Sequence, residues 1–180
     1  MLIIFGGLPG TGKTTTARAL ARELGAVHIR VDTVEQNIRA SGMLRSEVGP
    51  AGYLVSYGVA RDNLMIGNMV IADSVNSLNV TRDAWRSVAV QLSVPFFEVE
   101  VICSDQDEHR RRVETRVTDI EGLKQPSWED VTARHYDARH YDDWGQGPFI
   151  LDTAKQSVEQ SVNELISKLA LIRRQPPSGF

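Results

Sequence analysis

The stretch GLPGTGKT at residues 7–14 constrains the fold more than any other part of the chain. It satisfies the pattern G-x-x-x-x-G-K-[ST] of a phosphate-binding loop, which joins a strand to a helix. The apolar run Leu2–Phe5 precedes it, and apolar residues at helical spacing follow it at Ala17, Leu20, Ala21 and Leu24. Four fixed positions match by chance in about one chain of this length in a hundred. The motif therefore predicts an α/β nucleotide-binding domain.

The residue types in this loop indicate which ligand it favours. Consecutive backbone N–H groups form a nest for anions, and the positive end of the next helix adds attraction. Lys13 would bridge the terminal phosphates, and the Thr14 hydroxyl would ligate Mg²⁺. We expect nucleotide contacts from Gly7, Pro9, Gly10, Thr11, Gly12, Lys13, Thr14 and Thr15. Switches, motors and kinases all carry this loop, so it predicts the ligand and leaves the reaction open.

Apolar runs of strand length alternate with helical patterns along the chain. The runs are Leu2–Phe5, Val27–Val31, Met69–Ala72, Phe96–Cys103 and Phe149–Leu151. Such alternation implies right-handed crossovers and a parallel sheet that is covered on both faces. We predict a single α/β domain over residues 1–173 with a three-layer P-loop NTPase fold, a five-stranded parallel sheet and a short lid, followed by a flexible tail at 174–180.

Composition excludes several classes of protein. The net charge of −3 gives no overall attraction to nucleic acid or to anionic membranes, although a local basic patch stays open. Cys103 is the only cysteine, which rules out an internal disulfide and argues against a cysteine-based zinc site. The N-terminal apolar run has no positive region before it and ends at Gly6, so we expect neither a signal peptide nor a membrane span. These features predict a soluble, cytoplasmic protein.

Other side chains are expected to have structural roles. Glu98 and Glu100 interrupt the apolar run Phe96–Cys103, which predicts either a partly open face or a partner for these carboxylates on another element. No metal-binding pattern connects His109, His135 and His140. Packing is the expected role of Trp85, Trp128 and Trp144.

Two aspartates stand at the carboxyl ends of predicted strands, where ligands bind in doubly wound folds. Asp32 can accept a proton from a substrate hydroxyl or hold Mg²⁺ through water, and the alternative is an N-cap for a helix that starts near Thr33. Asp73 stands where P-loop enzymes place a second Mg²⁺ contact, and the alternative is a turn in the string DSVNS.

The segment HRRRVETR at residues 109–116 carries a cluster of arginines. Ser104 and Asp105 can cap this helix, and Arg112 and Arg116 are four residues apart and so share a helical face. Two guanidinium groups on one face can clamp a phosphate or stack on a base; the alternative is a solvated surface helix. The loop Val117–Ser127, which contains Gly122 and Pro126, favours the functional role because it is expected to be mobile.

Together these residues resemble the small P-loop kinases related to adenylate kinase. The similarity is to the predicted kinases often labelled AAA family ATPase, near polynucleotide 5′-hydroxyl kinases, gluconate kinase, and the zeta-toxin and chloramphenicol phosphotransferase group. The resemblance at RVD (residues 30–32) implies a base role for Asp32. The string IADSVN resembles the DxxN stretch of the polynucleotide kinase group, carried here by Asp73 and Asn76.

The resemblance extends to the second half of the chain. Arg112 and Arg116 match the paired arginines before the lid, one over adenine and one on the phosphates. The loop Val117–Ser127 resembles that lid, and LDT at residues 151–153 resembles the last strand and the adenine-side loop, which implies a nucleotide contact for Thr153. The loop has no second arginine pair, only Lys124, which argues against a nucleoside monophosphate as acceptor.

These observations predict transfer of the γ-phosphoryl group of ATP to a hydroxyl of a small molecule, with Mg²⁺ held by Thr14 and Asp73. Lys13 and Arg116 would neutralise charge and Asp32 would activate the acceptor. The acceptor pocket is expected from Asp32, Glu35, Arg39, Asn76 and the segment Ser41–Gly52. Two alternatives stay open: a 5′-hydroxyl polynucleotide kinase, which the acidic net charge disfavours, and a nucleotide-binding regulatory protein without an acceptor.

Overall fold

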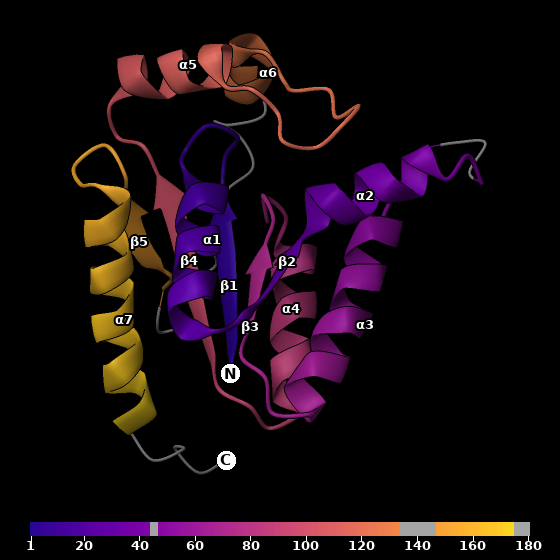
Figure 1. Ribbon diagram of the computed structural model, residues 1–180, viewed down its shortest axis with the longest axis vertical. Coiled ribbons are helices and arrows are strands. Elements are labelled where there is room, and N and C mark those ends of the chain that lie inside the picture. Colours follow the sequence, from indigo (N-terminus) through magenta and orange to yellow (C-terminus); the bar gives the residue numbers. More distant parts are fainter. Residues whose placement is uncertain (44–46, 134–146, 175–180) are drawn as a thin grey trace.

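The protein forms a five-stranded, fully parallel sheet with strand order β2-β3-β1-β4-β5. The computed structural model describes residues 1–43, 47–133 and 147–174 (Figure 1). The strands are β1 (Leu2–Gly7), β2 (Val27–Arg30), β3 (Val70–Asp73), β4 (Phe96–Ile102) and β5 (Phe149–Asp152). The predicted five-stranded parallel sheet is therefore confirmed. The strand ends differ from the predicted runs by one or two residues, because Val31 already belongs to a helix and Asp73 to a strand.

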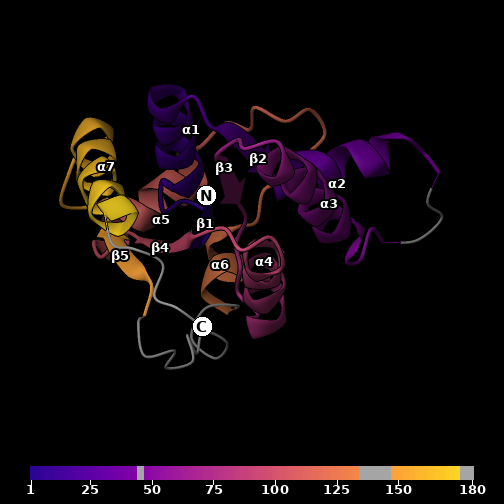
Figure 2. The same cartoon turned by 90° about the horizontal axis from the view of Figure 1, so that it is seen from below.

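Helices cover both faces of the sheet, as predicted. Figure 2 shows α1 (Lys13–Leu24) and α7 (Val158–Arg174) on one face, and α3 (Ala51–Met65) and α4 (Asn79–Gln91) on the other. Side chains of the central strand β1 alternate between the two cores. Ile3 and Phe5 pack in the core under α1 and α7, whereas Leu2 and Ile4 pack in the core with α3 and α4. Both faces of β1 are thus apolar, which explains its unbroken apolar sequence.

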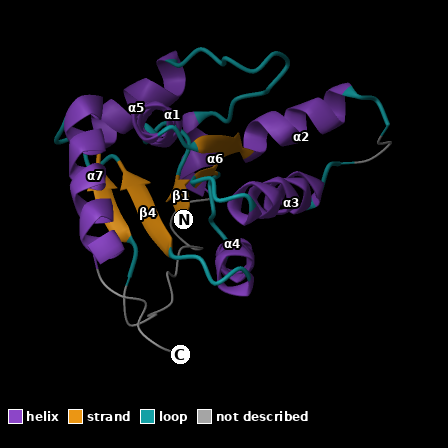
Figure 3. Ribbon diagram, turned by 60° about the horizontal axis from the view of Figure 1, so that its bottom comes forward, coloured by secondary structure: helices purple, strands orange, loops and turns teal. Residues whose placement is uncertain are grey.

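Three further helices lie at the carboxyl ends of the strands. They are α2 (Val31–Ala40), α5 (Gln106–Thr115) and α6 (Trp128–Ala133) (Figure 1, Figure 3). A small core of Leu8, Val113 and Val131, with Trp128 packed against it, holds α5 and α6 on the phosphate-binding loop. Within the described residues, no helix is both long and apolar enough to cross a bilayer.

The predicted structural side chains have defined partners. Arg86 on α4 binds both carboxylate oxygens of Glu98 at 2.9 and 2.7 Å, so another element does pair with a carboxylate of β4. Trp85 is fully buried and packs edge-on against Tyr57, which confirms its packing role. Asp105 is the N-cap of α5 and accepts a hydrogen bond from the Glu108 backbone N–H. His135, His140, Trp144 and tail residues 175–180 lie outside the described residues.

Candidate active site

A cleft of about 950 Å³ opens at the carboxyl ends of the strands. It lies between the phosphate-binding loop, the start of α2, the end of α5 and the loop that follows α5. The predicted site residues that line it are Pro9, Gly10, Gly12, Lys13, Thr14, Thr15, Asp32, Glu35, Arg39, Arg112 and Arg116. The structure therefore brings residues of the phosphate-binding loop, α2 and α5 together around one space.

The glycines of the phosphate-binding loop meet conformational and steric demands that other residues cannot. Gly10 has a φ of 87°, and a Cβ atom there would lie 2.4 Å from Val113 on α5. Gly12, the N-cap residue of α1, has a φ of 86° and makes no side-chain capping bond. The first N–H groups of α1 are thus not capped by a side chain, as a site for phosphate requires.

Lys13 forms a buried ion pair with Asp73 at the centre of the loop. The Lys13 Nζ atom lies 2.8 Å from Asp73 Oδ1, and His28 Nε2 lies 3.1 Å from Asp73 Oδ2. The pair forms because β1 and β3 are neighbours and both end at this point. Burial alone would raise the pKa of the Asp73 carboxyl, but Lys13 and His28 outweigh it and hold that pKa well below its usual range. His28 had no predicted role, and only the pairing of β2 with β3 reveals its contact.

The chemistry of the buried carboxylate suits a magnesium site. Thr14 lines the cleft beside Lys13, and Asp73, which is paired with Lys13, is an ionised carboxylate. A hydroxyl and a carboxylate are the oxygen donors that Mg²⁺ accepts next to phosphates. Lys13 has to leave Asp73 Oδ1 before that atom can bind a metal ion.

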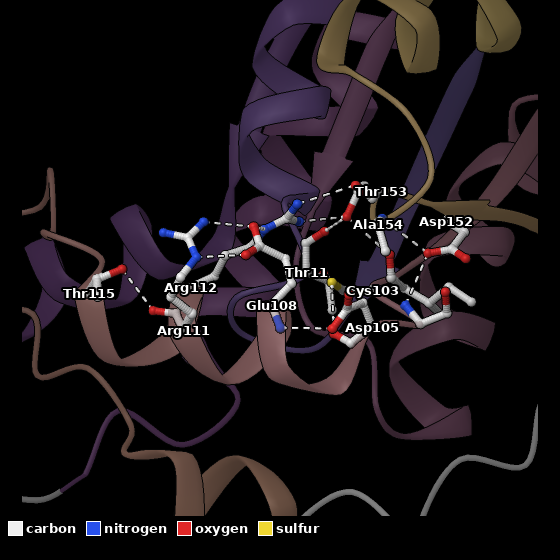
Figure 4. Close-up of polar contacts among 12 residues, drawn as sticks. Thr11, Cys103, Asp105, Glu108, Arg111, Arg112, Thr115, Asp152, Thr153 and Ala154 are labelled. Atoms are coloured by element: carbon white, nitrogen blue, oxygen red, sulfur yellow. Dashed lines mark hydrogen bonds and ion pairs between the residues drawn. The ribbon is translucent and has the colours of Figure 1, made fainter.

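Arg112 joins α5 to the loop after β5. Its two Nη atoms lie 2.8 Å from Thr153 Oγ1 and 3.2 Å from the Thr153 carbonyl oxygen, and its Nε atom lies 2.7 Å from Glu108 (Figure 4). The Thr153 hydroxyl in turn donates to the Thr11 carbonyl at 2.7 Å. Thr11 and Thr153 are buried and do not line the cleft, although nucleotide contacts were predicted for both. Their contacts join the phosphate-binding loop, α5 and the loop after β5 to one another.

His109 also holds the phosphate-binding loop against α5, and the sequence pattern did not reveal this role. Its Nε2 atom donates to the Pro9 carbonyl at 2.9 Å, and its ring packs edge-on against Trp128. Burial lowers the pKa of the His109 imidazole, which favours the neutral ring. His109 and Val113 lie one helical turn apart, so α5 contacts the phosphate-binding loop through both.

Asp32 lies in the first turn of α2 rather than before it. The helix begins at Val31, not near Thr33 as predicted, and its N-cap residue is Arg30 without a side-chain bond. The N-cap alternative for Asp32 is therefore wrong, and its carboxylate lines the cleft. Glu35, one turn later, packs against Gly52 of α3, and burial raises the pKa of the Glu35 carboxyl.

Asn76 takes a different position from the other expected substrate residues. It is 1% exposed, has a φ of 51°, and donates from its amide to the Phe5 carbonyl at 2.9 Å. Neither Asn76 nor any residue of the described part of Ser41–Gly52 lines the cleft. The side chain of Asn76 thus braces the turn after β3 against β1.

Arg116 stands just beyond the end of α5, which stops at Thr115. Its backbone is extended, so Arg112 and Arg116 do not share a helical face as predicted, although both line the cleft. The Arg116 Nε atom is buried and has no hydrogen-bond partner among the described residues. Burial lowers the pKa of its guanidinium, and Asp32 is the nearby anion that opposes this shift.

The loop Val117–Ser127, here called the lid loop, runs from the end of α5 towards α2 (Figure 3), and most of its residues line the cleft. Its Asp119 binds Arg18 of α1 at 2.6 Å and Arg30 of β2 at 2.7 Å. Gly122 of the same loop lies against Gln36 of α2, so the lid loop contacts α1, β2 and α2.

Comparisons with known proteins agree with this architecture. The model of a family described as AAA domain matches residues 2–137. Replication factor C large subunit of Pyrobaculum arsenaticum is 29% identical over an alignment of 134 residues that covers 72% of this chain and 29% of that protein. The chain thus spans less than a third of the length of this curated relative.

Several solved structures share the fold over nearly the whole chain. A candidate kinase from Chloroflexus aurantiacus has a TM-score of 0.72 and 21% identity, with 94% of this chain and 96% of that chain covered. The APS kinase CysC of Mycobacterium tuberculosis, solved with AMPPNP and APS, has a TM-score of 0.67, 20% identity and the same coverage. A gluconokinase from Sinorhizobium meliloti has a TM-score of 0.63 and 20% identity over 94% of this chain and 91% of that one.

Proposed function

The chain belongs to the AAA domain family, and on that premise we propose that it transfers the γ-phosphoryl group of ATP to a hydroxyl of a small molecule. One observation carries this proposal. The cleft of about 950 Å³ is lined by most residues of the phosphate-binding loop, and also by Asp32, Glu35 and three arginines, Arg18, Arg30 and Arg39. A nucleotide on the loop would leave the part of the cleft near Asp32 and Glu35 for another reactant. The names of similarly folded proteins, APS kinase and gluconokinase, support the same reaction class.

The residues of the loop have separate roles in this proposal. Lys13 moves from Asp73 to the terminal phosphates when nucleotide enters. Thr14 and Asp73 would hold Mg²⁺, which neutralises phosphate charge when it is bound. The uncapped start of α1 donates backbone N–H groups to the phosphates.

Asp32 and Arg116 act at the reacting atoms. Asp32 takes the proton of the acceptor hydroxyl while the hydroxyl oxygen forms a bond to the γ-phosphorus. The bond from this phosphorus to the bridging oxygen of ADP breaks, and ADP leaves with the electron pair. The unpartnered Nε atom of Arg116 donates to the charged oxygens that develop during transfer.

A screen of ATP consumption tests the reaction class. The panel contains hydroxylated metabolites, antibiotics and oligonucleotides with a free 5′-hydroxyl, and each is scored for ADP release and for phosphorylated product. We expect turnover that depends on a small-molecule acceptor. Turnover only with oligonucleotides would assign a polynucleotide kinase, and nucleotide binding without any acceptor would assign a regulatory protein.

Asp32→Asn separates a base from a residue that only shapes the cleft. Asparagine keeps the size of the side chain but cannot take a proton. We expect acceptor phosphorylation to fall about 10²–10⁴-fold, while ATP affinity and thermal stability stay nearly unchanged. Asp62→Asn is the matched control, because Asp62 is an exposed residue of α3 outside the cleft. Equal turnover in Asp32→Asn and wild type would refute the base role.

A further inference from the structure

Asp119 of the lid loop is held between two arginines from different elements. Its Oδ2 atom lies 2.6 Å from Arg18 Nη2 on α1, and its Oδ1 atom lies 2.7 Å from Arg30 Nη1 at the end of β2. All three residues line the cleft. A single carboxylate thus occupies a small basic subsite that the chain builds from α1 and β2.

The subsite has more donors than Asp119 uses. The side chain of Arg30 is only 14% exposed, and its Nε atom is buried without a hydrogen-bond partner in the described part of the chain. Asp32 is a further anion close to Arg30, with its Oδ2 atom 3.8 Å from that Nε atom. Arg116, which lines the same cleft, also has a buried and unpartnered Nε atom. Buried guanidinium donors are normally satisfied by an anion or by water, so this excess indicates a site for a further anionic group.

Asp119 itself is suited to being displaced. It sits in an irregular loop, its side chain is 49% exposed, and it offers one oxygen to each arginine. The carboxylate of both ion pairs is therefore open to solvent, which screens their attraction. The buried Lys13–Asp73 pair, in contrast, belongs to the core of the site.

The subsite also lies on the side where the second reactant is proposed to bind. Arg30 ends β2, an edge strand of the sheet, and Asp32 follows two residues later. The Arg112–Thr153 contact lies at the opposite edge, beside β5. An anion between Arg18 and Arg30 would therefore belong to the molecule that approaches Asp32.

From these observations we propose that Arg18 and Arg30 form a subsite for an anionic group of the acceptor, and that Asp119 occupies this subsite until the acceptor displaces it. The group is a carboxylate, a sulfate or a phosphate, each of which matches two guanidinium groups. This inference rests on the proposed phosphotransfer, because it names the class of hydroxyl compound that is phosphorylated.

A competing role for the same contacts is a latch that holds the lid loop closed during the reaction. The two roles predict opposite effects for Asp119. If Asp119 competes with the acceptor, its removal strengthens anion binding, whereas removal of either arginine weakens it. If Asp119 is a latch, the loss of Asp119 and the loss of either arginine impair the enzyme alike.

An NMR titration with inorganic sulfate measures the subsite directly. The Nε–H signals of Arg18 and Arg30 report local binding whatever occupies the phosphate-binding loop, and Arg18→Gln and Arg30→Gln assign them. We expect Asp119→Asn to saturate at about 2- to 30-fold lower sulfate than wild type, since two exposed ion pairs are removed. Either arginine variant should lose saturable binding at the remaining signal.

Matched controls come from the same elements. Glu121→Gln removes an exposed carboxylate from the lid loop, and Arg22→Gln removes an exposed arginine one turn further along α1; neither residue lines the cleft. Both should titrate like wild type. The subsite is refuted if Asp119→Asn matches wild type, or if Glu121→Gln produces the same gain.

Acceptor pairs test whether the subsite serves the reaction. Each anionic hydroxyl compound is assayed beside its neutral analogue: a sugar acid beside its polyol, a sugar phosphate beside its sugar, and a nucleoside sulfate or phosphate beside its nucleoside. Arg18→Gln should lower kcat/KM for the anionic member and not for the neutral one, while Asp119→Asn should lower the KM of the anionic member.

The outcomes separate this inference from the proposed function. An anionic acceptor that wild type and Arg18→Gln phosphorylate equally well would overturn the acceptor role of the subsite while the phosphotransfer stands. Sulfate binding at Arg18 and Arg30 without phosphorylation of any compound would overturn the proposed function and, with it, the acceptor role of the anion subsite.

Discussion

The two ends of the cleft are built from different kinds of contact. At the end near β5, buried hydrogen bonds join Thr153 to Thr11 and His109 to Pro9, and Gly10 packs directly against Val113. At the end near β2, the lid loop is held by the exposed ion pairs of Asp119. Buried contacts to backbone carbonyls fix geometry before a ligand arrives, whereas exposed ion pairs exchange readily. The molecule therefore has one preformed half and one adaptable half.

The largest expected effect comes from Lys13→Ala, in the phosphate-binding loop between the two ends of the cleft. Loss of the ammonium should reduce turnover by several orders of magnitude, because no other group on the loop replaces it at the terminal phosphates. It also leaves the Asp73 carboxylate buried with only His28, which should cost about 3–5 kcal/mol of unfolding free energy. Steady-state kinetics and urea unfolding measure the two effects.

The double variant Lys13→Ala/Asp73→Asn separates these two losses. It removes the uncompensated charge, so much of the stability should return while turnover stays lost. If stability and turnover recover together, the Lys13–Asp73 pair acts only through folding.

Arg116→Ala, at the junction between the two halves, has the next largest expected effect. Its guanidinium is half-buried with an unpartnered Nε atom, so it is available to charge that develops during transfer. We expect kcat to fall about 10²–10³-fold with a much smaller change in ATP affinity. Arg110→Ala is the control, since Arg110 is exposed on α5 and paired with Glu114. A fall in ATP affinity equal to the fall in kcat would contradict a role specific to the transition state.

Thr153→Val should produce a moderate loss in the preformed half. The change removes the hydroxyl that donates to the Thr11 carbonyl and accepts from one Nη atom of Arg112, while the other Arg112 bonds to the Thr153 carbonyl and Glu108 stay. We expect a cost of about 1–3 kcal/mol in thermal unfolding and weaker nucleotide binding. Thr153→Ser keeps the hydroxyl and should behave nearly as wild type; an equal loss in both variants would assign the effect to the methyl group instead.

The smallest expected effect concerns the pH dependence of the adaptable half. Hydrogen bonds from Arg30 and Arg18 lower the pKa of Asp119 to about 2. Because the folded pKa lies below the value of about 3.9 in an unfolded chain, this contact contributes stability above pH about 4 and loses it as the pH falls towards 2. Carboxyl-carbon NMR should show the pKa of Asp119 rising towards its ordinary value in Arg30→Gln. An unchanged pKa in that variant would mean that Arg30 does not hold Asp119 in solution.

The amino-acid sequence by itself determined the parts of this protein that depend on local pattern. The GLPGTGKT motif, the five apolar runs and the helical stripes predicted the parallel sheet, its two covering layers and the position of the phosphate-binding loop. The N-cap at Asp105 was also predicted, because capping involves residues three positions apart. Such features need only neighbours along the chain, so periodicity and motif spacing are enough to predict them.

Only the tertiary structure decided which distant side chains meet. The Asp119 contacts span 101 and 89 positions, to Arg18 and Arg30, and the His109 contact with Pro9 spans 100. These partners follow from strand order and from where each helix ends, and no local pattern encodes either. For the same reason Asn76 is hydrogen-bonded to Phe5 of β1 instead of lining the cleft, and Arg116 lies beyond the end of α5 instead of on its face. Local interactions determine which helices and strands form, whereas the packing of these helices and strands determines which charges face one another across the cleft.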